Sequence, residues 1–358
     1  MKEKMFENIC IAPWNMLRIE HSGDCYICTS SFQKFNLGNI FEKSFEEIWN
    51  GDLISEVRKK IILEGDYSYC RTDLCHKYLK EPAPLLDFSE PDKEKIAFSK
   101  APSIIFFAFD YSCNQKCVFC RDKVMMMNEA EAQKWLDVLE EKIFPIIKDV
   151  KYIEMNHAGE FLDGFLSEKL VSRVLELNPN IKFNIISNGV VLSQEKLKKI
   201  NLEGRINIVH VSMHSATKET YKKIFRKDNF EIVLKNIEYL KELREKGKIK
   251  RFELMFVICS LNYKEIPLFI QLAKKYSAVP SFSLMNYKGD TVYGYNQSEY
   301  EIFSKEHIHY NDFVKVLKSK EVSEYIDIMP PILREIKPQT FMEKINLYIK
   351  TMKKKLMK

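Results

Sequence analysis

The sequence lacks the long apolar segments that carry a chain into or across a membrane. Its first residues, MKEKMFENICIAPWN, contain no uninterrupted apolar core of the kind that a signal peptide has. Further along, charged residues interrupt every hydrophobic stretch before it reaches the length of a membrane span. We therefore expect a cytoplasmic protein without a membrane partner.

A strong excess of one charge is also missing. The chain has 56 Lys and Arg against 50 Asp and Glu, which gives a net charge of only +6 over 358 residues. Because basic and acidic residues are interspersed, the charge is weak evidence for nucleic-acid binding, and we expect no nucleic-acid partner. The lysine-rich end, YIKTMKKKLMK, is interpreted as a packing helix with a solvated tail.

Cysteine, by contrast, is concentrated in one part of the chain. In a cytoplasmic protein, cysteines indicate a metal site or a reactive role rather than disulfides. Eight of the nine fall within the first 120 residues, so we expect their site to be assembled there. They stand at positions 10, 25, 28, 70, 75, 113, 117, 120 and 259.

The chain divides by composition into four parts. Residues 1–85 are rich in cysteine and include a predicted helix over 44–65, with a capping box of Ser44 and Glu47 and an end at Gly65. Residues 86–101, in a proline-containing region that disfavours helix, form a linker. Residues 102–290 form the core domain, and 291–358 a C-terminal extension of loops and helix.

The core domain repeats one pattern. Apolar runs typical of buried strands begin near residues 102, 150, 181, 206, 251 and 280, and charged segments with helical periodicity lie between them. The run at 102 is expected to be buried on both faces. Six strands alternating with helices predict an α/β fold with parallel strands. A barrel and an open doubly wound sheet both fit this pattern.

Three cysteines follow the first of these strands, in the stretch FDYSCNQKCVFC. A closed structural zinc site needs four ligands, and this loop offers only Cys113, Cys117 and Cys120. A cubane iron–sulfur cluster has four irons, so three cysteines would leave one iron open to a substrate or cofactor. The incomplete set therefore predicts a catalytic cluster.

The Cys-x3-Cys-x2-Cys spacing, with Phe119 before the last cysteine, resembles the signature of radical S-adenosylmethionine (radical SAM) enzymes. The resemblance implies a partial (β/α)6 TIM-like barrel and a 4Fe-4S cluster whose open iron is chelated by S-adenosylmethionine. It also implies an external electron donor such as flavodoxin or ferredoxin. Reductive cleavage then gives a 5′-deoxyadenosyl radical that takes a hydrogen atom from the substrate.

The same resemblance implies the cofactor contacts at the methionyl end. The segment HAGE ends the second strand and is similar to the Gly-Gly-Glu element of the family, so Gly159 and Glu160 would hold the methionyl amino group. Ala158 replaces the first glycine of that element. Arg226 matches the arginine that binds the methionyl carboxylate, through two parallel hydrogen bonds.

Further contacts are implied at other strand ends. Ser187 and Asn188, in the segment SNG, end the third strand where the family often contacts the ribose. Ser212 ends the fourth strand at the place of a cofactor-contacting serine, and Phe119 lies beside the cluster.

The N-terminal part resembles the SPASM or twitch module, an auxiliary 4Fe-4S domain. The resemblance implies the ligands Cys10, Cys28, Cys70 and Cys75, with Cys25 as a spare that could replace Cys28. The seven-cysteine set of the full module is incomplete, so we expect a single auxiliary cluster. A structural zinc ion remains the alternative for this module.

Three residues near the expected cavity could act on the substrate. Alternation along RFELMFVICS places Cys259 on the face of Glu253, which we expect to line the cavity. Its thiol is a candidate hydrogen-atom donor, and the alternative is a small buried residue. His157 and His214, both at strand ends, are candidate acids or bases, or else hydrogen-bond to a loop or cofactor.

The sequence thus predicts hydrogen abstraction followed by oxidation or epimerisation of a small, sugar-like metabolite. Modification of a ribosomally made peptide is the alternative within this enzyme class. From other classes, a non-catalytic zinc or iron–sulfur protein that binds RNA or a partner, and a sensor without turnover, stay open.

Overall fold

The computed structural model describes residues 10–72, 75, 97–121, 123–155, 159–285, 300–325, 329, 330 and 333. These residues form two compact units. The first unit comprises the described residues up to 114 together with 123–210 and 235–252, and the second comprises the remainder. Within these residues, no helix has the length and apolar character needed to cross a membrane.

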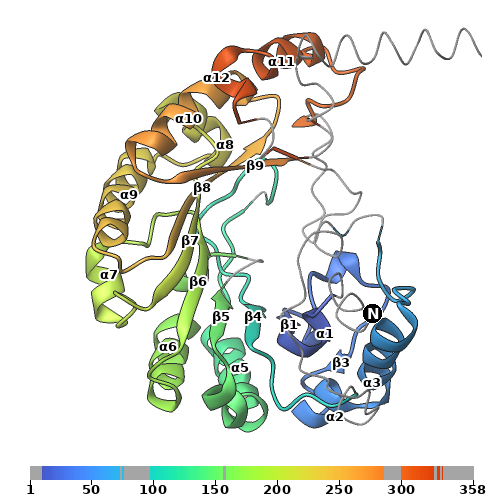
Figure 1. Cartoon of the computed structure of the whole chain (residues 1–358). Coiled ribbons are helices and arrows are strands. Elements are labelled where there is room, and N and C mark those ends of the chain that lie inside the picture. Colours follow the sequence, from blue (N-terminus) through green and yellow to red (C-terminus); the bar gives the residue numbers. More distant parts are fainter. Residues whose placement is uncertain are drawn as a thin grey trace, which may run out of the picture. The chain divides into compact units, whose positions relative to one another are not determined.

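All six strands predicted for the core domain are present, as β4 to β9 (Figure 1). The strand order is β3-β2-β1-β4-β5-β6-β7-β8-β9. From β4 to β9 the strands are adjacent in chain order, whereas a doubly wound sheet reverses direction at a switch point. The α/β class is therefore confirmed, and the order is that of a barrel-type series. The strands are β1 (Met16–Glu20), β2 (Asp24–Tyr26), β3 (Gly38–Asn39), β4 (Ile104–Ala108), β5 (Tyr152–Met155), β6 (Lys182–Ser187), β7 (Ile206–Ser212), β8 (Arg251–Ile258) and β9 (Val279–Leu284).

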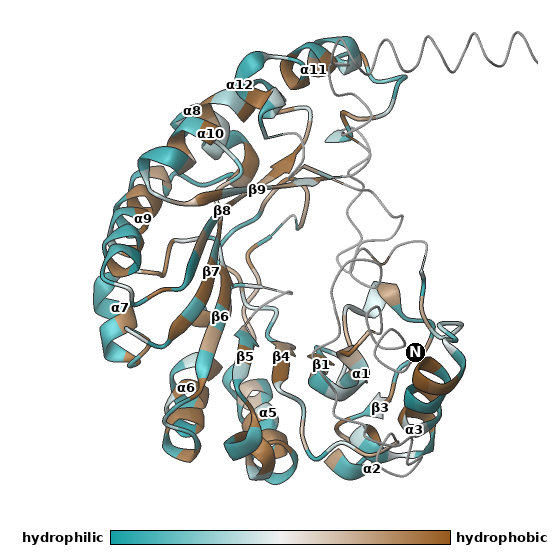
Figure 2. Ribbon diagram, in the orientation of Figure 1, coloured by the Kyte–Doolittle hydropathy of each residue, from teal (hydrophilic) through white to brown (hydrophobic). Residues whose placement is uncertain are grey.

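Helices follow most of these strands, as the alternating pattern predicted. In Figure 2 α5 and α6 carry both brown and teal residues, as expected of helices with one face on a sheet and one in water. The helices are α1 (Ala12–Asn15), α2 (Phe45–Asn50), α3 (Asp52–Lys59), α5 (Glu129–Lys142), α6 (Leu166–Leu177), α7 (Gln194–Lys199), α8 (Lys218–Phe225), α9 (Phe230–Glu245), α10 (Ile266–Lys275), α11 (Tyr310–Leu317) and α12 (Lys320–Ser323).

The two faces of the sheet in the first unit differ in polarity. On one face, the aligned residues Leu17, Ile105 and Ile153 are fully buried. On the other face, Phe106 lies beside Arg18 and Glu154 and remains partly exposed. The expectation that the run at 102 is buried on both faces is therefore wrong, because Ile104 and Phe106 on the second face of β4 are only partly buried.

The cysteine-rich N-terminal segment contributes strands to the same sheet. β1 pairs in parallel with β4, with Met16 opposite Ile104 and Glu20 opposite Ala108. β2 and β3 then continue the sheet in antiparallel pairs. The N-terminal segment is thus joined to the core domain by main-chain hydrogen bonds as well as by the linker.

The helix predicted over 44–65 is interrupted. The capping box of Ser44 and Glu47 is present at the start of α2, and Gly65 ends the region with a φ of 64°. However, Gly51 is extended and separates α2 from α3. A Cβ at this position would lie 2.2 Å from the carbonyl oxygen of Glu47, so only glycine allows this close turn.

Two predicted regions fall largely outside the described residues. Only 97–101 of the linker 86–101 are described, and only parts of the extension 291–358. The three boundaries between the four predicted parts stay predictions.

Candidate active site

Cys113 is held at the start of its loop by a two-way main-chain bridge. Its N–H donates to Met125 O at 2.7 Å, and Met125 N–H donates back to Cys113 O at 3.3 Å. Both residues belong to the first unit. The bridge fixes the backbone that carries the first of the three thiols, five residues after the end of β4.

Cys117 and Cys120 lie in the second unit and share a tight turn. Cys120 N–H donates to Cys117 O at 2.9 Å, while Val118 N–H donates to Ile224 O at 2.9 Å. The turn is thereby attached to the end of α8. Cys113, Cys117 and Cys120 are each partly exposed.

Gly159 and Glu160 pack directly on the backbone that precedes Cys113. Glu160 N–H donates to Ser112 O at 2.5 Å. A Cβ at position 159 would lie only 2.3 Å from the same oxygen. Glycine at 159 is therefore required for this approach, which sets the Glu160 side chain beside the cysteine loop.

The Glu160 carboxyl group is almost fully buried, and only one of its two oxygens accepts hydrogen bonds from the described residues. Its Oε2 accepts hydrogen bonds from Ser187 Oγ at 2.9 Å and from Asn188 N–H at 2.6 Å. Its Oε1 is buried with no hydrogen-bond partner among the described residues. Burial raises the pKa of Glu160 to about 8, against the opposing effect of these two hydrogen bonds.

The Asn188 side chain reaches the cysteine loop. Its Nδ2 donates to Asn114 Oδ1 at 2.9 Å and lies 3.9 Å from the sulfur of Cys113. Asn236 supports the loop after β6 from behind, by donating to the carbonyl oxygens of Gly189 and Val190. Ser187 and Asn188 thus bind Glu160 and the cysteine loop, and the contact with the ribose that the resemblance implied stays a prediction.

In the second unit, His214 is enclosed between aromatic rings. Its ring meets Phe119 edge-on at 5.0 Å and stacks on Phe225 at 5.6 Å. Nδ1 accepts the N–H of Val257 at 3.1 Å, and burial lowers the pKa of His214 to about 3. A neutral ring with one nitrogen already bonded to the backbone favours the hydrogen-bonding role that the sequence left open, over the role of acid or base.

Cys259 follows β8 and is fully buried. Burial raises the pKa of its thiol to about 11, so the group carries its proton at neutral pH, as a hydrogen-atom donor must. Asn262 holds this segment: its Oδ1 accepts the Cys259 N–H, and its Nδ2 donates to the carbonyl oxygens of His214 and Val257. On the same parity, Met255 and Val257 are partly exposed whereas Glu253 is buried, and the position of Cys259 in the cavity stays a prediction.

The remaining predicted contacts are placed as follows. Ser212 is half-buried at the end of β7. Arg226 is half-buried and ends α8 with a φ of 53°, a left-handed conformation that few arginines adopt. His157 lies outside the described residues.

The four cysteines predicted for the auxiliary cluster lie in the first unit and interact electrostatically, although no three His, Cys, Asp or Glu side chains among the described residues are already placed to hold a metal ion. The thiols of Cys10, Cys70 and Cys75 all lie close enough to Cys28 to raise its pKa, after the larger effect of burial, to about 12. Cys10 and Cys75 likewise raise the pKa of Cys70, after the larger effect of burial. Thiols are the donors that an iron–sulfur cluster uses, and the assignment of these four as its ligands stays a prediction.

Cys25, the spare of the sequence, is not part of this group. It lies in β2, is fully buried and directs its sulfur toward the carbonyl oxygen of Gly23 at 3.6 Å. Burial and the neighbouring Asp24 raise the pKa of its thiol. The structure therefore separates Cys25 from the thiols of Cys10, Cys28, Cys70 and Cys75.

Comparison with known protein families decides the identity of the chain. The model of the radical SAM superfamily matches residues 110–273, and that of the SPASM iron–sulfur cluster-binding domain matches residues 10–78. The chain is a radical SAM enzyme with an N-terminal SPASM domain. Its cofactors are S-adenosylmethionine, the 4Fe-4S cluster that binds it, and auxiliary iron–sulfur binding centred on the SPASM domain, which is a cluster-binding domain.

The radical SAM enzyme is also similar to solved structures, at low identity. The structure of Streptococcus suis SuiB bound to S-adenosylmethionine is 16% identical in sequence, with a TM-score of 0.44. The match covers 89% of this chain and 70% of that chain. The structure of BtrN in complex with AdoMet and 2-DOIA is 15% identical in sequence, with a TM-score of 0.27. The match covers 62% of this chain and 85% of that chain. No curated protein matches the chain by sequence.

The described residues of this radical SAM enzyme fit the cofactors. Glu160 Oε1 is a buried acceptor without a partner among the described residues, and it suits an ammonium group. Within the cysteine loop, both polar atoms of the buried Gln115 side chain also have no partner in the described part of the chain. Buried polar atoms without protein partners, next to thiol ligands, are expected at a site that binds a cofactor.

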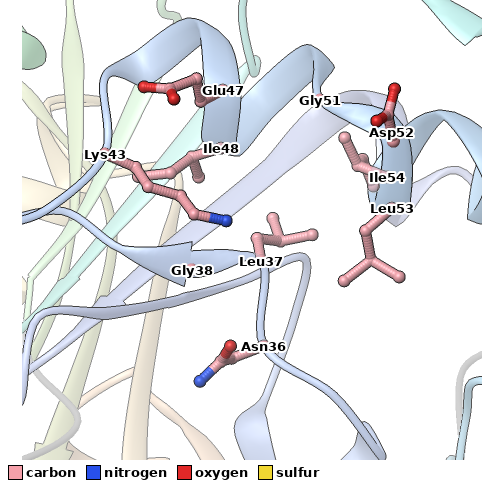
Figure 3. Close-up of a pocket in the computed structure, with 10 residues that line it drawn as sticks. All are labelled: Asn36, Leu37, Gly38, Lys43, Glu47, Ile48, Gly51, Asp52, Leu53 and Ile54. Carbon is pink, nitrogen blue, oxygen red and sulfur yellow. The ribbon is translucent and has the colours of Figure 1, made fainter.

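A separate cavity of about 560 Å³ lies in the SPASM domain, beside β3 and the junction of α2 and α3. Figure 3 shows Lys43 extending toward Leu37 there, with Glu47 and Asp52 at the rim. Its lining includes none of the predicted cluster or cofactor ligands.

Sequence reasoning missed Asn114, Gln115, Asn262 and Gln33. Each is a single amide residue without a repeated spacing, so no motif marks it. Asn114 and Gln115 stand inside the cysteine loop, and that position was the one available signal.

Proposed function

We propose that the enzyme cleaves S-adenosylmethionine at Cys113, Cys117 and Cys120 and uses the resulting radical on a small polar metabolite. The three cysteines hold the barrel cluster. Glu160 binds the methionyl amino group through Oε1, and Arg226 binds the methionyl carboxylate. Ser212 and Phe119 lie along the cofactor. The observation that carries the proposal is the buried, half-satisfied carboxyl group of Glu160 beside the Cys113 loop.

When bound, the cluster and S-adenosylmethionine supply one-electron cleavage to a 5′-deoxyadenosyl radical. The chain itself orients the reactants. Asn188 keeps Glu160 Oε2 occupied, so that Oε1 is left for the cofactor, and its Nδ2 approaches Cys113. Gly159 allows the two segments to meet. The electron comes from an external donor such as flavodoxin or ferredoxin, in the cytoplasm.

The polar face of the sheet in the first unit supports a polar substrate. Arg18 and Glu20 form an ion pair there with a 2.6 Å contact between Nε and Oε1. On the same face, Asn184 Oδ1 accepts a hydrogen bond from Asn207 at 2.8 Å. Charged and amide groups in one row suit a substrate rich in hydroxyl or amino groups better than an apolar one.

The test of cofactor cleavage is an assay for 5′-deoxyadenosine after anaerobic reconstitution and reduction with dithionite. We expect release by the unmodified chain, loss to background in Cys117→Ala, and retained release in Cys25→Ala, which removes a thiol outside both ligand sets. Equal release by the two variants, or none from a chain with its full iron content, would overturn the proposal.

Epimerisation through Cys259 is the second reaction that an observation favours, because the thiol is buried and protonated. A reaction in deuterated water separates the outcomes. One solvent deuteron at an inverted carbon, absent with Cys259→Ala, supports hydrogen return from the thiol. A product two hydrogens lighter supports oxidation instead, with Cys10, Cys28, Cys70 and Cys75 holding the auxiliary cluster. If the substrate is a ribosomally made peptide, the deuterium label would appear in a peptide product.

A further inference from the structure

Gln33 joins two of the auxiliary cysteines through different parts of the residue. It follows the short helical turn Ser30–Phe32 and is 8% exposed. Its main chain forms an antiparallel bridge with Cys70. Flanking hydrogen bonds, from Lys34 N–H to Tyr69 O and from Arg71 N–H to Phe32 O, fasten the same two segments together. Gln33 therefore fixes the position of the backbone that carries Cys70.

The side chain of Gln33 turns toward Cys28. Its Oε1 accepts the N–H of Ile27 at 3.2 Å. Its Nε2 donates to Cys28 O at 3.0 Å and lies 3.4 Å from the Cys28 sulfur, within reach of an N–H···S hydrogen bond. One amide group thus holds the main chain at Ile27 and at Cys28.

The neighbours of the amide determine its orientation. A main-chain N–H can only donate and a main-chain carbonyl can only accept, so the oxygen must face Ile27 and the nitrogen must face Cys28. The NH2 group has two hydrogens. One satisfies Cys28 O, and the other is available to the sulfur.

We propose that Gln33 is a positioning residue that sets Cys28 and Cys70 for the auxiliary cluster and raises the reduction potential of that cluster. This rests on the ligand set proposed above. Reduction adds negative charge to the cluster and its thiolate sulfurs. An N–H···S hydrogen bond stabilises that charge, so the reduced state gains more than the oxidised state.

The experiment is a redox titration of the full-length protein with both clusters assembled, followed by electron paramagnetic resonance. A variant with Cys113, Cys117 and Cys120 all changed to Ala identifies which signal belongs to the auxiliary cluster. Iron and sulfide content are measured for every sample, so that a changed potential is separated from a lost cluster.

Two substitutions remove the donor in different ways. Gln33→Leu removes both amide atoms, and Gln33→Glu keeps an oxygen for the Ile27 N–H while removing the NH2 group. We expect both to shift the auxiliary potential to more negative values. Gln133→Leu, at an exposed position of α5, is the matched control and should leave the potential unchanged. An unchanged potential in Gln33→Leu and Gln33→Glu, with full iron content, overturns the proposal.

A spectroscopic measurement on the unmodified residue covers the case in which neither variant assembles the cluster. With ¹⁵N in glutamine side chains, pulsed hyperfine spectroscopy of the auxiliary signal should detect the labelled nitrogen, and its proton should exchange in deuterated water. Absence of this coupling overturns the proposal. Neither result depends on release of 5′-deoxyadenosine. Full iron in Cys28→Ala would instead contradict the ligand set itself.

Discussion

The main-chain N–H of Asn188 donates a 2.6 Å hydrogen bond to Glu160 Oε2. Because the side chain of the same asparagine approaches the Cys113 sulfur, one residue at the end of β6 connects the carboxyl group proposed for the cofactor with a proposed cluster ligand. The other carboxyl oxygen, Oε1, is left buried and without a partner among the described residues. The arrangement makes the charge of Glu160 the central quantity for cofactor binding.

Glu160→Gln is expected to weaken binding of S-adenosylmethionine. A hydrogen bond to a charged group contributes about 1.5–3 kcal/mol, so the dissociation constant should rise about tenfold to hundredfold. Equilibrium dialysis of the reconstituted protein under anaerobic conditions measures the change. Glu168→Gln is the control, since Glu168 is a surface carboxylate of α6 paired with Lys196 and Lys199. Similar affinities in the two variants would contradict the role of Glu160.

Binding of S-adenosylmethionine is also expected to release a proton near pH 6.5. Burial raises the pKa of Glu160 to about 8, so the carboxyl group is protonated at this pH before the cofactor binds. The α-amino group of the cofactor, with an ordinary pKa of about 7.7–8.0, arrives as an ammonium ion. The bound pair needs the carboxylate, and the proton of Glu160 must leave.

Calorimetry in buffers of different ionisation enthalpy measures this release. We expect the unmodified protein to release about one proton more per bound cofactor than Glu160→Gln, because an amide has no proton to lose in this range. The affinity should rise between pH 6 and 7.5 for the same reason. An equal release of protons by both proteins would place the titrating group elsewhere.

The strands of the core could be predicted from sequence because each is a local pattern. The runs that became β4 to β9 are continuous, apolar and bounded by turn residues. β1 to β3 were not predicted, since Arg18, Glu20 and Asp24 make them polar and short. β1 forms a strand because it pairs with β4, which lies far along the chain. A contact of this kind leaves no periodicity in either segment.

The site shows the same division. The cysteine loop and the HAGE segment have fixed spacings that sequence can match to a function. Asn262 and Gln33 have no such spacing. Their roles depend on hydrogen-bond partners that cannot be recognised from the sequence: Asn262 donates to the carbonyl oxygen of His214, 48 positions away in the chain. The break at Gly51 was likewise hidden, since it depends on the approach of one carbonyl oxygen.

Asn262→Ala is expected to lower the free energy of unfolding by about 2–4 kcal/mol, since a buried group left without its hydrogen bond costs about 1–3 kcal/mol. The substitution removes the partner of Cys259 N–H and of the carbonyl oxygens of His214 and Val257. Urea unfolding followed by circular dichroism measures the loss. Asn180→Ala, at an exposed position, should stay within about 0.5 kcal/mol of the unmodified protein. A comparably small effect at Asn262 would mean that water replaces its amide.

The iron content of cysteine variants tests the two ligand sets against each other. Cys28→Ala should lose the iron of one 4Fe-4S cluster, about four atoms per chain, because a cluster of this type is held by cysteine thiolates. Cys25→Ala should keep its full iron content, since Cys25 is buried in β2 away from the other four thiols, although the lost sulfur destabilises the fold by about 1–2 kcal/mol. Iron and sulfide analysis after anaerobic reconstitution gives both numbers. Loss of iron in Cys25→Ala with retention in Cys28→Ala would reverse the assignment, and Gln33 would then lie next to a thiol that binds no metal.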